Sequence, residues 1–353
     1  MSRSRTRALT VTAAALATVF ALPAPAAHAQ QFVPCSANSL RSAINLANAI
    51  PGPAVLFLSS GCTYTLTAAD NPGNGLPVVT SDISVLGSGA TIRRQSAADF
   101  RILKVQGPGG RLTLNNLTIR DGRDVSGGEG GGGIAAFGGS TVTLNSVEVT
   151  RNFSGTAGAG GGVISFGTLN LRNSNVSYNI STNNGGGVHS IGTTNISNTT
   201  ITGNTARDDG GGMDVRGSLT LTGSRVTDNA ARLTAGGINA FELTGTVTDT
   251  LIRGNTTGGS DGGGLYHRTS TLTLERTTIF ANRALDSNAQ GGGVYNSPDA
   301  TLTLRNGSVT HNFSGTAPGG IFNDGGTVNL AATPVTDNQP TNCSPNPIPG
   351  CTN

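Results

Sequence analysis

The sequence predicts an all-β protein, a single-stranded right-handed parallel β-helix with about 25–30 residues per coil and a short N-terminal capping helix. Three observations predict this fold. A Gly-rich run followed by an apolar residue recurs along the chain, an asparagine recurs at a similar interval, and short runs that alternate Thr with apolar residues lie between them. Gly accounts for 53 of 353 residues, which suits a chain that turns often.

The two landmarks, the apolar residue after each Gly run and the asparagine, recur at similar intervals. The apolar residues after the Gly runs follow at intervals of 29, 25, 25, 25, 27, 29 and 27; they are Ile134, Val163, Val188, Met213, Ile238, Leu265, Val294 and Ile321. Each recurring asparagine has Val or Ile three residues before it; the asparagines are Asn152, Asn179, Asn204, Asn229, Asn255, Asn282, Asn312 and Asn338. Stacked coils would turn these positions into inward aliphatic columns and a ladder of hydrogen-bonded asparagines.

Other repeats fit less well. No stretch of the repeats keeps a helical apolar stripe, which excludes TPR and ankyrin repeats. A leucine-rich repeat would close each unit with leucines where this chain has Gly runs, and a nine-residue RTX repeat is missing. Several asparagines match N-x-S/T and are alternatively glycosylation acceptors.

The N-terminal segment predicts export. Three arginines precede an apolar run from Ala8 to Leu22, and Ala27-His28-Ala29 is a small-x-small site, so residues 1–29 are expected to be a signal peptide. The alternative, a membrane anchor, would need about 20 apolar residues. No other run of spanning length occurs, so we expect a secreted, extracellular protein without a membrane span in its mature chain.

The four cysteines lie near the ends of the expected mature chain. In an oxidising compartment an even number predicts disulfides. Three pairings are possible, and proximity favours Cys35–Cys62 and Cys343–Cys351. A four-cysteine zinc site would need closer pairs than these.

Four regions are expected: residues 1–29 as signal peptide, 30–122 as cap and irregular first coils, 123–338 as regular repeats, and 339–353 as a C-terminal cap or tail. Ser39 is the expected N-cap of a capping helix over residues 40–49, whose apolar face holds Leu40, Ala43, Ile44 and Ala47. Removal of the leader leaves 19 basic and 19 acidic residues. Such a neutral chain is not expected to bind nucleic acid.

These motifs carry a resemblance. The Gly-Gly-apolar run with an asparagine later in the same unit resembles the repeat of polymorphic outer-membrane proteins. Cys35 and the segment from Ser39 to Asn48 resemble the CSLREAI-x-x-AN segment at the start of many bacterial surface proteins. More broadly the chain is similar to the secreted pectate-lyase-like superfamily, which implies a right-handed parallel β-helix. That fold serves lyases, hydrolases, epimerases, adhesins and spacers, so it implies no single function.

Candidate site residues come from columns of outward positions. The first and third residues after each inward apolar landmark are expected to point outward. His189, Asp214 and Arg216 are the catalytic candidates, since Asp214 against His189 would make an acid–base pair. Five residues nearby are candidates for binding a sugar polymer, with rings stacking on the tyrosines: Asn239, Tyr266, His267, Arg268 and Tyr295. The alternative is an ordinary solvated sheet.

Signatures of specific enzymes are mostly absent. Asp209 and Asp261, the best acidic positions, are expected two coils apart, too far to share one calcium ion. No GxSxG, HExxH or P-loop occurs. We therefore expect no metal and no cofactor.

The sequence thus favours a non-catalytic adhesion or binding module for an extracellular polysaccharide or cell-envelope polymer. The alternatives are a polysaccharide lyase or glycoside hydrolase that works at His189 and Asp214, and a structural spacer.

Overall fold

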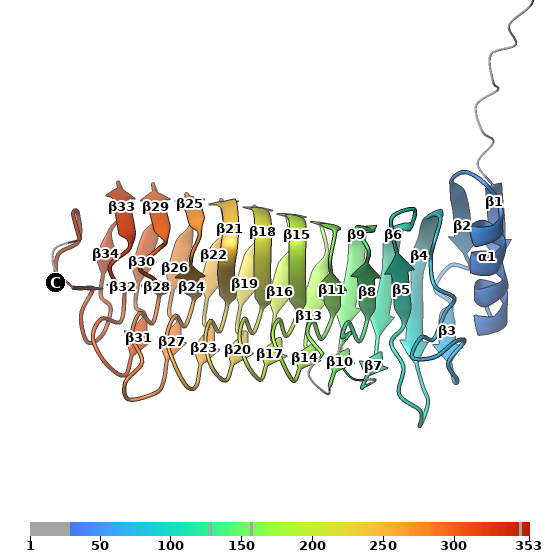
Figure 1. Ribbon diagram of the computed structural model, residues 1–353, viewed down its shortest axis with the longest axis horizontal. Coiled ribbons are helices and arrows are strands. Elements are labelled where there is room, and N and C mark those ends of the chain that lie inside the picture. Colours follow the sequence, from blue (N-terminus) through green and yellow to red (C-terminus); the bar gives the residue numbers. More distant parts are fainter. Residues whose placement is uncertain (1–28, 126, 128, 156–157, 346–347) are drawn as a thin grey trace, which may run out of the picture.

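The computed structural model describes residues 29–125, 127, 129–155, 158–345 and 348–353. The expected signal peptide lies almost entirely outside these residues. The chain winds into a right-handed parallel β-solenoid of about 11 turns (Figure 1), as the repeat predicts. The described strands form two parallel sheets, of 27 and 8 strands.

Each regular coil has four straight segments, which build four faces that we call A, B, C and D in chain order. The strands of face A are β5 (Leu103–Gln106), β8 (Ile134–Phe137), β11 (Val163–Ser165), β24 (Leu265–Arg268), β28 (Val294–Asn296), β32 (Ile321–Asn323) and β35 (Cys343–Ser344). Three longer strands bend from face A into face B: β15 (Val188–Ser197), β18 (Met213–Thr222) and β21 (Ile238–Thr248). The strands of face B are β1 (Ala29–Val33), β2 (Ala54–Leu58), β12 (Thr168–Arg172), β25 (Thr271–Glu275), β29 (Thr301–Arg305) and β33 (Thr327–Ala331).

The other two faces follow the same order. Three strands run from face B into face C: β4 (Asp82–Arg94), β6 (Arg111–Arg120) and β9 (Thr141–Thr150). The strands of face C are β3 (Thr63–Leu66), β13 (Asn175–Ser177), β16 (Thr200–Thr202), β19 (Arg225–Thr227), β22 (Leu251–Arg253), β26 (Thr278–Phe280), β30 (Ser308–Thr310) and β34 (Val335–Thr336). Face D holds the strands β7 (Arg123–Asp124), β10 (Phe153–Ser154), β14 (Ile180–Ser181), β17 (Thr205–Ala206), β20 (Ala230–Ala231), β23 (Thr256–Thr257), β27 (Arg283–Ala284) and β31 (Phe313–Ser314).

The core consists of aliphatic columns that run along the solenoid. Val176 pairs with Ile201 and Ile201 with Val226 on neighbouring coils of face C, and all three side chains are fully buried. The landmark residues of face A stack in the same way, from Val163 to Val188. Because one coil cannot bury these residues alone, the stacking itself supplies the hydrophobic stabilisation.

The recurring asparagines form a buried ladder at the turn between faces C and D. The main-chain N–H and the side-chain Nδ2 of Asn179 both donate to Oδ1 of Asn204, at 3.0 Å each. Nδ2 of Asn179 also donates to the carbonyl of Val149 at 2.9 Å. The ladder satisfies turn groups that no strand reaches. Close stacking also explains the glycines after the turn, since a Cβ on Gly186 would lie 2.4 Å from the carbonyl oxygen of Gly211.

The N-terminal end is covered by helix α1 (Ala37–Ala49), at the right of Figure 1. Its apolar face, Leu40 to Ala47, is buried as expected. The expected N-cap, Ser39, is wrong by one turn, because the N-cap is Ser36 and the helix begins earlier. Oγ of Ser36 accepts a hydrogen bond from the main-chain N–H of Ser39 at 3.1 Å. Cys35 and Cys62 form a disulfide beside this cap.

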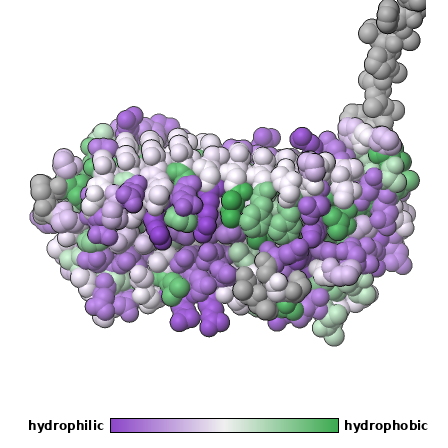
Figure 2. Space-filling model, in the orientation of Figure 1, coloured by the Kyte–Doolittle hydropathy of each residue, from purple (hydrophilic) through white to green (hydrophobic). Residues whose placement is uncertain are grey.

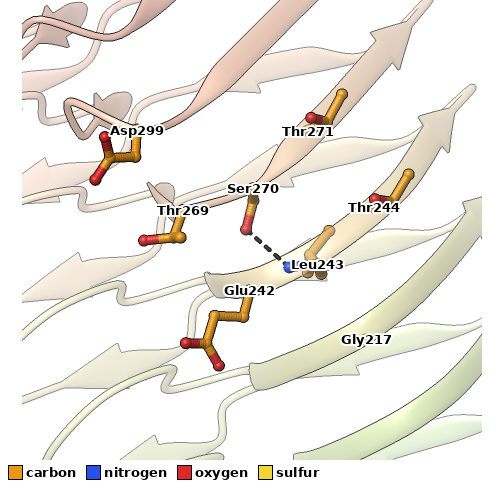
Figure 3. A pocket seen from close by; sticks show the side chains of 8 residues that line it. All are labelled: Gly217, Glu242, Leu243, Thr244, Thr269, Ser270, Thr271 and Asp299. Carbon is orange, nitrogen blue, oxygen red and sulfur yellow. Dashed lines mark hydrogen bonds between the residues drawn. The ribbon is translucent and has the colours of Figure 1, made fainter.

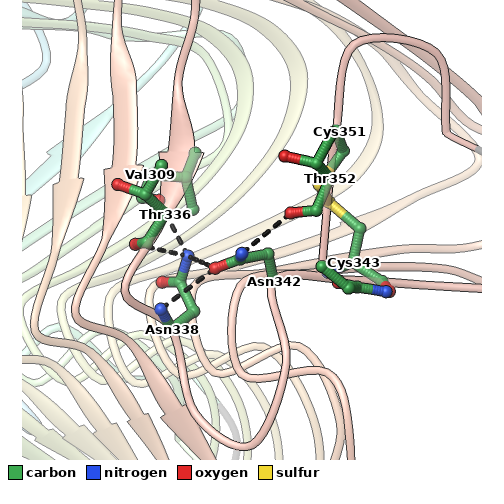
Figure 4. The surroundings of a disulfide bond; sticks show 8 residues. Val309, Thr336, Asn338, Asn342, Cys343, Cys351 and Thr352 are labelled. Carbon is green, nitrogen blue, oxygen red and sulfur yellow. Dashed lines mark hydrogen bonds between the residues drawn. A yellow bond between two sulfur atoms is a disulfide. The ribbon is translucent and has the colours of Figure 1, made fainter.

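The C-terminal end carries the second disulfide, between Cys343 and Cys351 (Figure 4). Asn342 adds a rung that the repeat spacing does not predict. Its Oδ1 accepts from the main-chain N–H of Asn338 at 3.1 Å, and its Nδ2 donates to the carbonyl of Thr352 at 2.8 Å. The ladder is thereby tied to the disulfide-closed end. In the described part of the chain, no helix has the length and apolar character needed to cross a membrane.

Candidate functional site

Face A carries most of the candidate residues, in two outward columns. The first outward column continues from coil to coil through His189, Asp214, Asn239 and Tyr266. Its side chains point away from the core, yet most are covered, because the turn that enters face A folds beside them. A Cβ on Gly185, for example, would lie 2.9 Å from Cβ of His189. The exposed chemistry of face A therefore lies mainly in the second outward column, which includes Arg216, Phe241 and Arg268.

His189, Asp214 and Asn239 form a buried polar cluster on three successive coils. Nδ1 of His189 lies 2.7 Å from Oδ2 of Asp214, and Nδ2 of Asn239 donates to Oδ1 of Asp214 at 2.8 Å. The exposed fraction is 6% for His189, zero for Asp214 and 6% for Asn239. Oδ1 of Asp214 thus accepts a hydrogen bond, whereas Oδ2 lies in short contact with Nδ1 of His189 without hydrogen-bond geometry. Asp214 therefore has no exposed surface for a ligand.

Arg216 does not join this cluster. Its guanidinium lies over the ring of Phe241, 4.5 Å from the centroid, and the guanidinium of Arg268 lies 4.9 Å from the same centroid. Because the two arginines come from the coils on either side of Phe241, the ring is held between two cations. Among the described residues, neither arginine makes an ion pair with a carboxylate.

Three aromatic rings stack on the C-terminal half of face A. The rings of Tyr266 and Tyr295 are 4.7 Å apart and nearly parallel, and Phe322 lies 5.3 Å from Tyr295. Tyr266 and Phe322 lie on either side of Tyr295, which leaves little of its ring open to the sugar rings that are predicted from the sequence to stack there. The side chain of Tyr295 donates instead to Oδ2 of Asp324 at 2.7 Å.

The two tyrosines remain protonated. Burial raises the pKa of Tyr266, and the nearby carboxylate of Asp261 raises it further. Burial also raises the pKa of Tyr295, as does its hydrogen bond to Asp324. Both phenols therefore stay neutral at neutral pH, and that of Tyr295 serves as a hydrogen-bond donor.

Acidic side chains line the turns that enter face A. Burial raises the pKa of Asp209, and Asp214 and Asp208 add to the effect, although Thr234 hydrogen-bonds the carboxylate at 2.6 Å. Burial likewise raises the pKa of Asp261, whose Oδ1 accepts from the main-chain N–H of Gln290 at 2.7 Å. Within the described ranges, no group of three or more His, Cys, Asp or Glu side chains converges as metal ligands would.

His267 was wrongly predicted to bind a ligand. It lies two residues after the inward Leu265, so it faces the core, and its exposed fraction is zero. Nδ1 of His267 donates to Oδ1 of Asn296 at 2.7 Å, and Nε2 has no partner in the described part of the chain. Burial lowers the pKa of His267, so the ring is neutral.

An apolar patch lies at the N-terminal side of the polar residues. The rings of Phe137 and Phe166 stack at 5.5 Å, and Phe166 meets the edge of His189 at 6.1 Å. Figure 2 shows this apolar surface over β8, β11 and β15, next to a hydrophilic stretch over β18 to β24. Along the solenoid axis, face A thus passes from an apolar patch over β8 to β15 to a hydrophilic stretch over β18 to β24.

Two features of face A were not singled out from the sequence. One is Phe241, whose ring packs against the guanidinium groups of Arg216 and Arg268. Glu242 is an extra residue, because the interval from Met213 to its coil partner Ile238 is one residue shorter than the interval from Leu221 to its partner Val247. A comparison of these two intervals in the sequence would have located the extra residue, which forms a bulge in the strand.

No protein-family model matches the chain, and no curated protein matches it. Among solved structures, the A-module of the Azotobacter vinelandii mannuronan C-5 epimerase AlgE6 is similar, with a TM-score of 0.46 and 16% sequence identity. The match covers 86% of this chain and 90% of that chain. A similarity of this extent assigns no chemistry to face A.

Proposed function

We propose that this protein is a secreted, non-catalytic β-helix that binds an acidic extracellular polysaccharide along face A. The arrangement of Arg216, Phe241 and Arg268 carries the proposal. Two guanidinium groups, unpaired within the described residues, flank one aromatic ring on a face whose neighbouring groups are hydrogen-bonding side chains. The ring orients both guanidinium groups before a ligand arrives, which lowers the entropic cost of binding.

Carboxylate-bearing sugars suit this arrangement. A guanidinium binds a carboxylate with two parallel hydrogen bonds, and Arg is preferred over Lys where that geometry matters. The two arginines lie two coils apart, about 10 Å from the coil spacing, so they would contact separate acidic units of one polymer. The carboxylates near the turns, such as Asp324, would accept hydrogen bonds from sugar hydroxyl groups.

The ends of the molecule support an extracellular location. Both disulfides close a terminal region, and disulfides persist in oxidising compartments. The expected signal peptide agrees with this. The partner would then be a polysaccharide of the surroundings or of the cell envelope.

A second candidate function is catalysis by His189. The contact with Asp214 favours it, because a buried carboxylate against Nδ1 orients a histidine as a general base. The position of Arg216 argues against it, since its guanidinium packs on Phe241 and forms no ion pair with Asp214 in the described chain. A lyase would need a cation beside the acidic sugar at the reacting carbon, and a hydrolase would need a second carboxyl group on the other side of the scissile bond.

Affinity electrophoresis in gels containing alginate, polygalacturonate or neutral dextran tests the binding function. We expect retardation by at least one acidic polymer and none by dextran. In the combined variant Arg216→Gln/Arg268→Gln, the affinity for the acidic polymer, calculated from the retardation, should fall at least tenfold. Arg253→Gln is the matched control, since its guanidinium also lies over an aromatic ring, Phe280, but on face C. Absence of retardation by every polymer would refute the proposal and favour a spacer.

The same polymers separate binding from catalysis. A lyase releases unsaturated sugars that absorb in the ultraviolet, and a hydrolase releases new reducing ends. We expect neither product. Release that disappears in the His189→Ala variant would establish the enzymatic alternative.

A further inference from the structure

A polar pocket lies at the corner between faces A and B, beside the paired arginines (Figure 3). Its volume is about 350 Å³, which falls in the range of small-molecule sites, roughly 300–1,000 Å³. The residues that line it are Gly217, Glu242, Leu243, Thr244, Thr269, Ser270, Thr271 and Asp299. We call it the corner pocket.

The pocket exists because the corner changes length between coils. Val215 pairs with Ala240, but Gly217 pairs with Leu243, so the second coil has one more residue at the corner. That residue is Glu242, which adopts a left-handed conformation with φ of 49° and is exposed. The coil before it has no residue opposite Glu242, because only Arg216 lies between Val215 and Gly217. The corner pocket therefore lies where a coil with a shorter corner is followed by a coil with a longer one.

The lining side chains include carboxylates, which can accept hydrogen bonds, and hydroxyl groups, which can both accept and donate them. Glu242 and Asp299 stand on opposite sides, with Thr269 between them, as Figure 3 shows. Both acids are exposed, and neither has an ion-pair partner among the described residues. Thr244 and Thr271 add exposed hydroxyl groups. No basic side chain lines the pocket, so its charge rejects the anionic groups that the neighbouring arginines attract.

The backbones of the two acidic residues are separated by roughly the span of one sugar ring with a hydrogen bond at each end. They come from coils two apart, which places their backbones about 10 Å from each other. A pyranose ring is about half as wide, and a hydrogen bond at each end adds about 2.8 Å. Hydroxyl groups on opposite sides of one ring would then donate to both carboxylates. Ser270 does not compete for these ligand hydroxyl groups, because its Oγ already accepts a hydrogen bond from the main-chain N–H of Leu243 at 3.0 Å.

We propose that the corner pocket binds a single neutral, hydroxyl-rich pyranose unit. This deepens the proposed function, because the pocket and the arginines are adjacent in the chain: Phe241 precedes Glu242 and Arg268 precedes Thr269. A polymer whose acidic backbone lies on face A would place a neutral side unit in the pocket. The two sites together would select acidic polysaccharides that carry neutral branches.

Saturation-transfer NMR with the purified protein tests the pocket directly. The probes are the methyl α-pyranosides of glucose, galactose and mannose at millimolar concentration. We expect transfer to at least one of them, reduced at least fivefold in the Glu242→Ala/Asp299→Ala variant. Glu148→Ala/Asp337→Ala is the matched control, since it removes one exposed Glu and one exposed Asp elsewhere. The control should bind like the unmodified protein.

The Arg216→Gln/Arg268→Gln variant separates the two proposals. It should lose retardation by acidic polymers and keep transfer to the pyranoside. If no pyranoside receives saturation, or if the Glu242→Ala/Asp299→Ala variant binds as well as the unmodified protein, the pocket proposal is wrong. That result would leave the acidic-polymer binding of face A standing, because it is measured with different ligands and different variants.

Discussion

Nδ1 of His189 lies 2.7 Å from Oδ2 of Asp214, which comes one repeat later in the chain and lies directly beside it on the next coil. The contact is buried although it lies on the outward side of face A. A carboxylate held this way stabilises its surroundings whether or not the histidine ever meets a ligand.

Replacement of Asp214 by Ala should destabilise the protein by about 3 kcal/mol. The change removes the hydrogen-bond acceptor of the Asn239 amide and the carboxylate that lies against Nδ1 of His189, and loss of one partner of a buried pair costs about 3–5 kcal/mol. Urea unfolding followed by circular dichroism measures it. Asp208→Ala, a half-buried acid without an ion pair among the described residues, is the control and should change stability by less than about 0.5 kcal/mol. Equal effects of the two changes would contradict the structural role of Asp214.

Replacement of Asn204 by Ala should cost about 4 kcal/mol. Oδ1 of Asn204 accepts two hydrogen bonds from Asn179, and its Nδ2 donates to Asn229 and to the carbonyl of Val176. Each buried polar group left without a partner costs about 1–3 kcal/mol. Thermal unfolding gives the comparison with Asn329→Ala, an exposed asparagine of face B. A similar loss in both variants would show that the ladder adds no stability of its own.

Acidification should weaken the protein through His267. The pKa of His267 in the folded protein is lowered by burial below the ordinary 6.5, so the unfolded chain binds a proton more readily. The stability it confers is complete above about pH 6.5 and is lost as the pH falls toward the lowered pKa, by up to about 1.4 kcal/mol per pH unit. The pKa values of Asp209 and Asp261 are raised, so their contribution has the opposite sign and is lost as the pH rises.

A variant isolates the histidine from those aspartates. We expect the melting temperature of the unmodified protein to fall between pH 7.5 and pH 5.0 by about 3 °C more than that of His267→Gln. Calorimetry at the two pH values measures the difference, and the aspartates cancel because both proteins have them. An identical pH dependence would mean that His267 takes up its proton in the folded state without cost.

The two disulfides should contribute unequally. Cys35 and Cys62 are 27 residues apart and Cys343 and Cys351 are 8 apart, so the first closes the longer loop. The chain-entropy relation gives about 3.5 kcal/mol for the first and about 2.5 kcal/mol for the second. Paired Cys→Ser variants, compared by urea unfolding and by limited proteolysis, rank them. The reverse order would show that strain or residual structure, not loop length, decides.

The sequence was sufficient for the fold because its signals repeat. Val176, Ile201 and Val226 recur with the same neighbours, and only a coil that stacks like on like makes use of such a pattern. The asparagine three residues later is equally regular, and its hydrogen-bond partner is its own equivalent on the next coil. In such a repeat, residues that contact each other across coils occupy the same position in successive units, so the repeat interval predicts these contacts. The sequence of an ordinary globular protein has no such regular interval.

The candidate site was less predictable because it depends on how unlike neighbours pack. The sequence placed Tyr266 and Tyr295 in one column but did not show that their rings would cover each other. Strict alternation would have placed His267 inside, in the column of Ala240, although its chemistry suggested a surface role. Arg216 was expected near Asp214, and only side-chain packing shows that it turns to Phe241 instead.

The stacking also makes the length of the molecule adjustable. Val163 pairs with Val188 and Val188 with Met213, each one coil further along the chain and in the same register. Excision of the segment from Val188 to Gly212 would bring Met213 against Val163 and leave both terminal caps intact. Duplication of the segment would lengthen the rod by one rung of about 4.8 Å. Gain or loss of whole repeat units during evolution would thus change the length of the solenoid without any change in its terminal caps.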